Sequence, residues 1–419
     1  MTKKSYFPAI NDIVAARMRI GGVAVQTPLT GNMVLSERYG ADIRLKREDL
    51  QIVRSYKIRG AYNKMAQLSD DDLSAGVVCA SAGNHAQGVA YSCQALKCRG
   101  TIYMPTTTPR QKIDQVRMFG KDFVDIVLTG DTFDDSNREA LSFARDRGMT
   151  FIHPFDDPKT IEGQATVGME IIQEATAPVD YLFVPIGGGG LASGVGSYFK
   201  QISPSTKVIG VEPAGAASMK AAIEAGHPVK LPSLDNCGDG AAGAQAGEYT
   251  VEICRQVLDD IVTVPEGKVC TAILELYNRS ALVAEPAGAL SIAALDAYAD
   301  EIKGKTVVCV VSGSNNDITR TEEIRERSLL YEGLKHYFVV RFPQRSGALL
   351  NFLQQVLGKN DDITHFAYSK KNNREQGPAL VGIELQNRDD LKPLLERMSE
   401  KGFVYEYLNE MPDLFQFLF

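Results

Sequence analysis

Lys57 is the residue around which the candidate chemistry of this chain is arranged. It lies in residues 55–60, which have the sequence SYKIRG. A neutral amine can attack a carbonyl carbon or remove a proton, and burial favours the neutral form. A single lysine between such neighbours is in most proteins a surface residue, so Lys57 becomes a candidate only together with three further motifs.

The first of these motifs is a run of four glycines between an apolar stretch, residues 181–186, and a helical stretch, residues 191–201. Backbone without Cβ atoms can approach a ligand closely, and the start of a helix attracts anions. The spacing matches neither the GxGxxG of dinucleotide sites nor the GxxxxGK of P-loops. The run predicts a phosphate-binding turn, with a purely structural strand-to-helix turn as the alternative. The residues concerned are Gly187, Gly188, Gly189, Gly190 and Leu191.

The second motif follows another apolar run and also leads into a helix. It consists of Ser81, Ala82, Gly83, Asn84 and His85. The free N–H groups of such a turn can hold a carboxylate, and the amide of Asn84 adds a donor and an acceptor. His85 is equally consistent with an acid or base role and with a packing role.

The third motif is residues 312–315, with the sequence SGSN, at the end of the apolar run 306–311. The hydroxyl of Ser312 can cap the next helix or face a pyridine nitrogen. In the second case a neutral hydroxyl does not hold the ring protonated as a carboxylate would. A weaker electron sink favours prompt loss of a β-leaving group over chemistry that needs a long-lived carbanion.

Short apolar runs alternating with helical stretches position these motifs. The runs are residues 43–46, 76–80, 100–104, 124–128, 181–186, 207–211 and 306–311, and the helical stretches are 9–20, 58–68, 84–96, 109–119, 131–147 and 191–201. This alternation predicts an α/β fold with mostly parallel sheets covered on both faces. The motifs would then meet at the carboxyl ends of the strands, where such folds bind ligands. We also expect the irregular stretch 235–247 to border the site.

A different order of elements begins after about residue 325. Strand, helix, two strands, helix and strand are expected at residues 336–342, 346–357, 363–368, 379–385, 388–401 and 404–408. This βαββαβ order is that of a ferredoxin-like module. The chain of 419 residues therefore divides into a catalytic domain, 1–325, in two α/β subdomains, and a second domain, 333–419.

Composition excludes several classes of protein. The net charge of −7 and the absence of basic clusters argue against nucleic-acid binding, and no apolar run is long enough to span a membrane. The start of the chain lacks the apolar core of a secretory signal. Seven scattered cysteines are expected to be reduced core thiols, which indicates a cytoplasmic protein.

At these residues the sequence resembles the pyridoxal-phosphate-dependent threonine dehydratases, which have the tryptophan synthase β-like fold (fold type II). The resemblance covers almost the whole chain and includes residues 284–289, for which no catalytic role is carried over. It implies that Lys57 holds the cofactor as a Schiff base, that Asn84 contacts the ring hydroxyl and that Ser312 meets the pyridine nitrogen. It further implies that the glycine turn with Leu191 binds the phosphate and that residues 81–85 bind the substrate carboxylate.

The reaction implied by the resemblance is a β-elimination. The free amine of Lys57 removes the α-proton, and the 3-hydroxyl leaves with a proton, plausibly from the cofactor phosphate. Hydrolysis of the product yields a 2-oxo acid and ammonia; from L-threonine the oxo acid is 2-oxobutanoate, the first step towards isoleucine.

Two departures from related families bear on this prediction. Serine racemases of this fold have a serine where this chain has Ala82, and that serine is their acid or base on the second face. Those relatives also bind a divalent cation through a Glu-Pro segment and a downstream carboxylate. Here Glu212-Pro213 is followed by Ala216, Ala217 and Ser218. We therefore expect no dedicated metal site.

The C-terminal module resembles the ACT-like regulatory domain of the biosynthetic enzymes. The family implies a homotetramer that is inhibited by isoleucine, with valine as antagonist. About 90 residues allow a single copy of the module, so a complete effector site can require a neighbouring subunit.

Three alternatives remain open. Serine dehydratase and serine racemase are the other enzymes considered. Outside enzymes, the chain could be an amino-acid sensor that binds pyridoxal phosphate without catalysis, although the intact Lys57 and its companion motifs argue against this.

Overall fold

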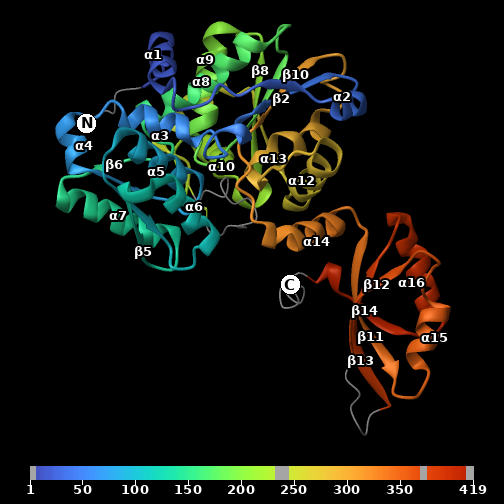
Figure 1. Ribbon diagram of the computed structural model, residues 1–419. Coiled ribbons are helices and arrows are strands. Elements are labelled where there is room, and N and C mark those ends of the chain that lie inside the picture. Colours follow the sequence, from blue (N-terminus) through green and yellow to red (C-terminus); the bar gives the residue numbers. More distant parts are fainter. Residues whose placement is uncertain (1–5, 232–244, 369–374, 412–419) are drawn as a thin grey trace. The chain divides into compact units, whose positions relative to one another are not determined.

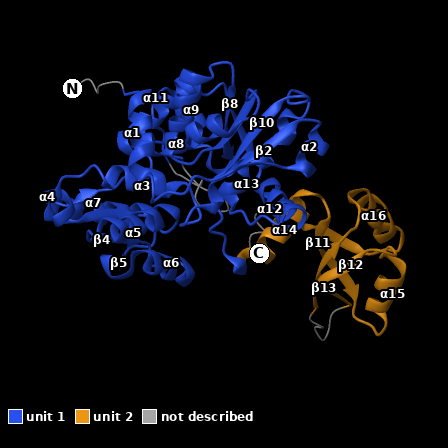
Figure 2. Ribbon diagram, turned by 45° about the horizontal axis from the view of Figure 1, so that its top comes forward, with its two compact units in different colours: residues 1–319 blue, residues 320–419 orange. Residues whose placement is uncertain are grey.

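A computed structural model describes residues 6–231, 245–368 and 375–411. The chain forms two compact units, residues 1–319 and 320–419 (Figure 2). The helix α14 (Thr321–Tyr331) belongs to the second unit. The predicted boundary between the two domains, near residues 325–333, begins inside this helix. The domain limits 1–325 and 333–419 stay a prediction.

The first unit contains two sheets. The larger sheet has the order β1 (Leu29–Gly31), β2 (Asp42–Arg47), β10 (Thr306–Val311), β7 (Tyr181–Pro185), β8 (Lys207–Pro213) and β9 (Asp260–Val264). The smaller has the order β5 (Val124–Leu128), β4 (Gly100–Met104), β3 (Val77–Ala80) and β6 (Thr150–Phe151). All pairs are parallel except β1 with β2. The predicted α/β class with two mostly parallel sheets is confirmed.

Helices cover both sheets of the first unit (Figure 1). They are α1 (Ile10–Ile20), α2 (Met33–Tyr39), α3 (Lys57–Met65), α4 (Asp70–Ala75), α5 (Asn84–Leu96), α6 (Arg110–Gly120), α7 (Phe133–Arg147), α8 (Pro158–Glu174), α9 (Gly190–Ile202), α10 (Ser218–Ala225), α11 (Glu248–Val257), α12 (Glu266–Ser280) and α13 (Pro286–Ala293). Strands β3, β7 and β10 are buried along nearly their whole length, as expected for parallel strands covered on both faces.

Capping residues explain where several of these helices begin. Asp157 accepts the N–H groups of Lys159 and Thr160 and is followed by Pro158 at the first helical position of α8. Thr132 and Asp135 form a capping box at the start of α7. By contrast, α9 begins at a glycine without a side-chain cap, which leaves its first N–H groups open to a ligand.

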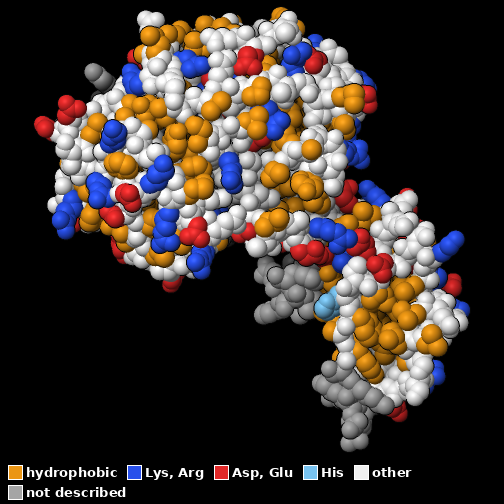
Figure 3. Space-filling model, viewed as in Figure 1, with side chains coloured by type: hydrophobic (Ala, Val, Ile, Leu, Met, Phe, Trp, Pro, Cys, Tyr) orange, Lys and Arg blue, Asp and Glu red, His pale blue; other side chains and the backbone are white. Residues whose placement is uncertain are grey.

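The second unit is the predicted βαββαβ module. After α14 its elements are β11 (Lys335–Pro343), α15 (Ala348–Gln355), β12 (Asp362–Tyr368), β13 (Gln376–Glu384), α16 (Leu391–Glu400) and β14 (Val404–Tyr407). The antiparallel sheet has the order β12-β13-β11-β14, and aromatic rings such as Phe342, Phe352 and Phe403 fill its core. Hydrophobic side chains also gather on the face of this unit that is visible in Figure 3.

The structure also shows how charge is distributed on the surface and how long and apolar the helices are. Lys and Arg side chains alternate with Asp and Glu on the visible face of the first unit (Figure 3). None of the helices in the described ranges is long and apolar enough to cross a membrane. The six cysteines in these ranges are free and buried, as predicted; Cys237 lies outside them.

Candidate active site

A cavity of about 970 Å³ opens at the carboxyl ends of β3, β7 and β10. Its volume is within the range of small-ligand sites. Most of the predicted site residues line it, namely Lys57, Ser81, Ala82, Gly83, Asn84, His85, Gly187, Gly188 and Ser312. Gly189, Gly190 and Leu191 are not among the lining residues, and the side chain of Leu191 packs in the core of the larger sheet. Residues 235–247 were expected to border the site. Of these, residues 235–244 lie outside the described ranges, and Gln245, Ala246 and Gly247 line the cavity.

Lys57 is the first residue of α3 and is positioned by the strand next to it. The N–H of Tyr56 donates to the Ser312 carbonyl at 3.2 Å, which ties the start of α3 to the end of β10. The Nζ atom of Lys57 donates to the Pro154 carbonyl at 2.9 Å. Burial lowers the pKa of Lys57 to about 8, although the negative charge of Glu285 acts in the opposite direction. A useful fraction of the amine is therefore neutral near neutral pH.

The amide of Asn84 is held by two partners. Its Nδ2 donates to Glu285 Oε1 at 2.6 Å, and its Oδ1 accepts from Asn315 Nδ2 at 2.6 Å. Glu285 Oε2 in turn accepts the backbone N–H of Asn315 at 3.1 Å. A Cβ atom at Gly313 would lie 2.4 Å from Glu285 Oε1, so a side chain there would displace the carboxylate that holds Asn84. The orientation of Asn84 is thus set, and its second N–H stays available to a ligand.

His85 is held in one neutral form. Its Nε2 lies 2.8 Å from the Ile152 carbonyl, which only accepts, so Nε2 carries the proton. Its Nδ1 has no hydrogen-bond partner among the described residues. Burial and the nearby Lys57 lower the pKa of His85 to about 3. Of the two roles left open for His85, the geometry favours packing over proton transfer.

The glycine turn presents unused backbone donors. Among the described residues, no acceptor is found for the N–H groups from Gly187 to Leu191, and these point out of the start of α9. Gly189 has φ of +92°, a conformation that favours glycine, and the hydroxyl of Thr250 donates to the Gly188 carbonyl at 2.7 Å. Because the helix start also carries partial positive charge, the turn can bind a phosphate.

Ser312 lies at the end of β10, and the hydrogen bond of its hydroxyl is to α13 and not to the helix that follows it. Its hydroxyl donates to the Ala287 carbonyl at 3.1 Å, in the first turn of α13, and it also lines the cavity. To donate to an unprotonated pyridine nitrogen, the Ser312 hydroxyl would have to turn its proton away from the Ala287 carbonyl.

Several lining residues were not predicted from the sequence. Glu285 belongs to a segment that was noticed without a role, and Asn315 ends a motif of which only the first residue was singled out. His153 and Asp156 flank Pro154: His153 Nδ1 accepts the N–H of Asp156 at 2.8 Å, and Asp156 accepts the N–H of Tyr249 at 2.8 Å. These residues form hydrogen bonds between loops that border the cavity. No local sequence pattern predicts such a role.

No group of three or more His, Cys, Asp and Glu side chains in the described part of the chain has the geometry of a metal site. The carboxylate of Glu212 accepts the N–H groups of Met219 at 2.7 Å and Lys220 at 2.9 Å, at the start of α10. The absence of a dedicated metal site stays a prediction.

Fold and site together define the class of protein. Residues 22–313 match the family model of pyridoxal-phosphate-dependent enzymes, and residues 326–418 match the C-terminal regulatory domain of threonine dehydratase. The site fits this cofactor because it offers a buried amine, a turn of free N–H groups, an amide donor and a hydroxyl. The processed form of threonine deaminase isoform 2 from Solanum lycopersicum is similar in structure, with a TM-score of 0.72 and 42% identity over 78% of this chain and 96% of that chain. Maize serine racemase has a TM-score of 0.71 and 29% identity over 78% of this chain and 99% of that chain.

Relatives of similar length narrow the class further. The biosynthetic L-threonine dehydratases IlvA of Halalkalibacterium halodurans and Bacillus subtilis (strain 168) are each 58% identical, over 98% and 100% of this chain and 99% of their own lengths. The chain belongs to the pyridoxal-phosphate-dependent enzymes and, among them, to the family of the biosynthetic L-threonine dehydratases. The predicted family and cofactor are confirmed.

Proposed function

We propose that this chain is an L-threonine dehydratase that converts L-threonine to 2-oxobutanoate and ammonia and opens the route to isoleucine. The relatives of similar length support this assignment. The observation that carries it is the buried amine of Lys57, with a pKa lowered to about 8, in the same cavity as an anion-binding glycine turn.

The proposed roles follow from the donors and acceptors around the cavity. Pyridoxal phosphate, when bound, supplies the electron sink for the electrons of the broken Cα–H bond. Lys57 would hold the cofactor covalently, and its free amine would take the α-proton at Nζ. The N–H groups of residues 187–191 hold the phosphate. Asn84 has a free N–H that would donate to the ring hydroxyl, and Ser312 would hold the ring nitrogen.

Substrate binding is assigned to the turn before α5. The N–H of Ser81 donates to the Tyr103 carbonyl and that of Gly83 to the Ser81 hydroxyl, so the backbone N–H groups of Ala82, Asn84 and His85 are the ones assigned to the substrate carboxylate, at the start of this helix where anions are stabilised. Ala82 lines the cavity and carries no proton to exchange. The methyl group of Ala82 cannot return a proton as the serine of the racemases does, so elimination is the expected outcome rather than racemisation.

Release of oxo acid from L-threonine and L-serine, measured side by side, tests the proposal. We expect 2-oxobutanoate from threonine at the higher kcat/KM, no D-serine from L-serine, and loss of both product and visible cofactor absorbance in Lys57→Ala. A higher kcat/KM for serine would support a serine dehydratase, and D-serine formation would support a racemase. Cofactor absorbance without any turnover would support a sensor.

We further propose that the second unit makes the enzyme subject to inhibition by isoleucine, which valine relieves. We also propose that the enzyme is a homotetramer located in the cytoplasm. The match of residues 326–418 to a regulatory domain supports the control, and the exposed hydrophobic face in Figure 3 is consistent with contacts between chains. Rate measurements with isoleucine and valine, and light scattering for the mass in solution, test both parts. A monomer with unchanged rates would contradict them.

A further inference from the structure

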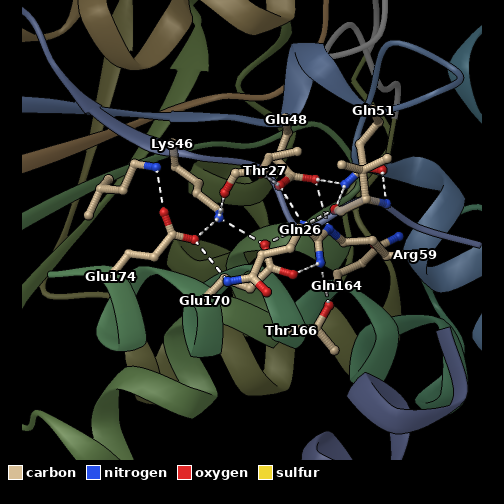
Figure 4. Close-up of polar contacts among 12 residues, drawn as sticks. Gln26, Thr27, Lys46, Glu48, Gln51, Arg59, Gln164, Thr166, Glu170 and Glu174 are labelled. Carbon is tan, nitrogen blue, oxygen red and sulfur yellow. Dashed lines mark hydrogen bonds and ion pairs between the residues drawn. The ribbon is translucent and has the colours of Figure 1, made fainter. Parts of the chain in front are cut away.

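Arg59, two residues after Lys57, belongs to a buried cluster of charges, the Arg59 cluster (Figure 4). Its members are Thr27, Lys46, Glu48, Arg59, Thr166 and Glu170, and the four charged side chains are 0–1% exposed. Two cations face two carboxylates, so the buried charge is balanced. Buried ion pairs are often no more stabilising than apolar residues of the same volume, so stability alone is a weak reason for such a cluster.

Arg59 uses all three of its nitrogens in this cluster. It meets Glu48 through two hydrogen bonds of 2.8 Å and Glu170 through two of 2.7 Å. Its Nη1 also donates to Thr166 Oγ1 at 3.1 Å, and its Nη2 to the Val25 carbonyl at 3.3 Å. A guanidinium held by two bidentate pairs has a single allowed orientation.

The partners of Arg59 come from separate parts of the fold. Glu48 lies in the short helix η1 (Glu48–Leu50) that follows β2 of the larger sheet, and Glu170 lies in α8. Lys46 of β2 donates to Glu170 at 2.8 Å and to the Thr27 carbonyl. The cluster therefore ties the first turn of α3 to β2 and to α8.

Lys57 stands two residues before Arg59 in the same turn of α3. Residues two apart on a helix point in different directions, so Arg59 enters the cluster while Lys57 enters the cavity. The backbone of this turn is also enclosed: a Cβ at Gly163 would lie 2.6 Å from the Arg59 carbonyl, and one at Gly88 would lie 3.2 Å from the Lys57 carbonyl carbon. The turn is therefore packed closely on both sides, and the hydrogen bonds of Arg59 restrain it further.

We propose that Arg59 is a positioning residue that fixes the backbone of Lys57, so that its amine returns to one place whether or not it is bonded to the cofactor. The inference rests on the proposed function, in which Lys57 must first leave the cofactor and then act as a base. A base that starts from a backbone in a fixed place loses less entropy in reaching the α-proton.

The test compares Arg59→Lys with Lys46→Met, both as cofactor-loaded full chains. Lys46 is the other fully buried cation and pairs with the same Glu170, but it lies on β2 and not on α3. Wild-type turnover of threonine reports on the proposed function independently of either variant. The readouts are kcat and KM, the melting temperature, and the rate at which borohydride-trappable cofactor forms on Lys57, measured by peptide mass spectrometry.

We expect Arg59→Lys to lower kcat and the rate of cofactor attachment by about 10- to 100-fold, with KM changed far less, because small misplacements of a reacting group cost that much. Lys46→Met should lower the melting temperature by a similar amount. It should keep kcat and the rate of cofactor attachment within about twofold of the wild-type values. Equal effects of the two variants on both rates would overturn the proposal.

If Arg59→Lys does not fold, Thr166→Val decides, because it removes only one acceptor of the Arg59 guanidinium. A slower cofactor attachment at unchanged melting temperature supports the proposal, and wild-type attachment and kcat contradict it.

Discussion

At the scale of single residues, the chemistry depends on how much neutral amine Lys57 presents. Burial lowers the pKa of this amine to about 8, and the negative charge of Glu285 works against that shift. Glu285 thus has two effects, since it also orients the amide of Asn84. In the proposed reaction, Glu285 would affect both the basicity of Lys57 and the position of Asn84.

This arrangement predicts how cofactor capture varies with pH. Because only the neutral amine attacks an aldehyde, the rate at which apo-protein captures pyridoxal phosphate should rise about tenfold per pH unit and level off above the Lys57 pKa of about 8. In Glu285→Gln the charge that raises the Lys57 pKa is gone, so the rise should move to lower pH. Stopped-flow absorbance measures both curves. Glu301→Gln, an exposed change, is the control, and an unmoved curve in Glu285→Gln would refute the role of Glu285.

At the scale of elements, the position of α3 is set by its contact with α8. A Cβ at Gly60 would lie 2.7 Å from the Thr160 carbonyl, so the two helices touch backbone to backbone. The same two helices supply Arg59 and Glu170. The close packing of α3 on α8 and the ion pair between Arg59 and Glu170 therefore both restrain the same turn of α3.

Gly60→Ala tests this contact. The added methyl must push α3 away from α8, and such overpacking costs about 1–3 kcal/mol of the free energy of unfolding. Gly31→Ala is the control, because a Cβ at Gly31 meets nothing within 4 Å, and it should change stability by less than about 0.5 kcal/mol. Urea unfolding of the two apo-proteins measures the difference. Equal stabilities would show that α3 can shift freely.

The link between β8 and α10 makes a separate prediction about pH. Burial raises the pKa of Glu212 from 4.5 to about 7, despite the N–H groups of Met219 and Lys220 that favour its charge. Between these two pH values the folded state holds a proton that the unfolded chain has released, so stability falls as pH rises through this window.

Comparison of the wild type with Glu212→Gln measures this effect. The free energy of unfolding of the wild type, relative to the variant, should fall by up to about 3 kcal/mol from about pH 5 to about pH 8. Glu224→Gln, an exposed change on the same helix α10, should show no such trend. A flat difference for Glu212→Gln would mean that Glu212 is ionised throughout.

At the scale of the whole molecule, the two compact units have separate hydrophobic cores. The first contains the cavity and the Arg59 cluster, and the second has its own core around Phe342 and Phe352. Because residues 326–418 match a regulatory domain, control and chemistry are assigned to different units.

Ending the chain after Thr319, at the limit of the first unit, tests that division. The shortened protein should keep cofactor absorbance and threonine turnover and lose its response to isoleucine, because the chemistry needs only residues of the first unit. Initial rates with and without isoleucine check this, with the full chain as the control. Isoleucine inhibition that survives the truncation would place the effector site in the first unit.

Much of the architecture could be predicted because it follows from local patterns. The helix Asn84–Leu96 and the strands Gly100–Met104 and Val124–Leu128 were expected at their observed limits. The helix Pro158–Glu174 was not expected, because it is buried on nearly all sides and shows no apolar stripe, although Asp157 and Pro158 mark its start. Burial depends on neighbours that the sequence does not name.

The sequence by itself singled out the candidate reacting groups: Lys57, the glycine turn, the Asn84 loop and Ser312 each occupy a few consecutive residues, and the proposed chemistry restricts which residue types can stand there. Only the tertiary structure decided what holds them. Asn84 meets Glu285 across 201 residues, and Arg59 meets Glu170 across 111. The physical reason is that such pairs gain their energy from being buried together, and burial is a property of the packed chain and not of any segment of it.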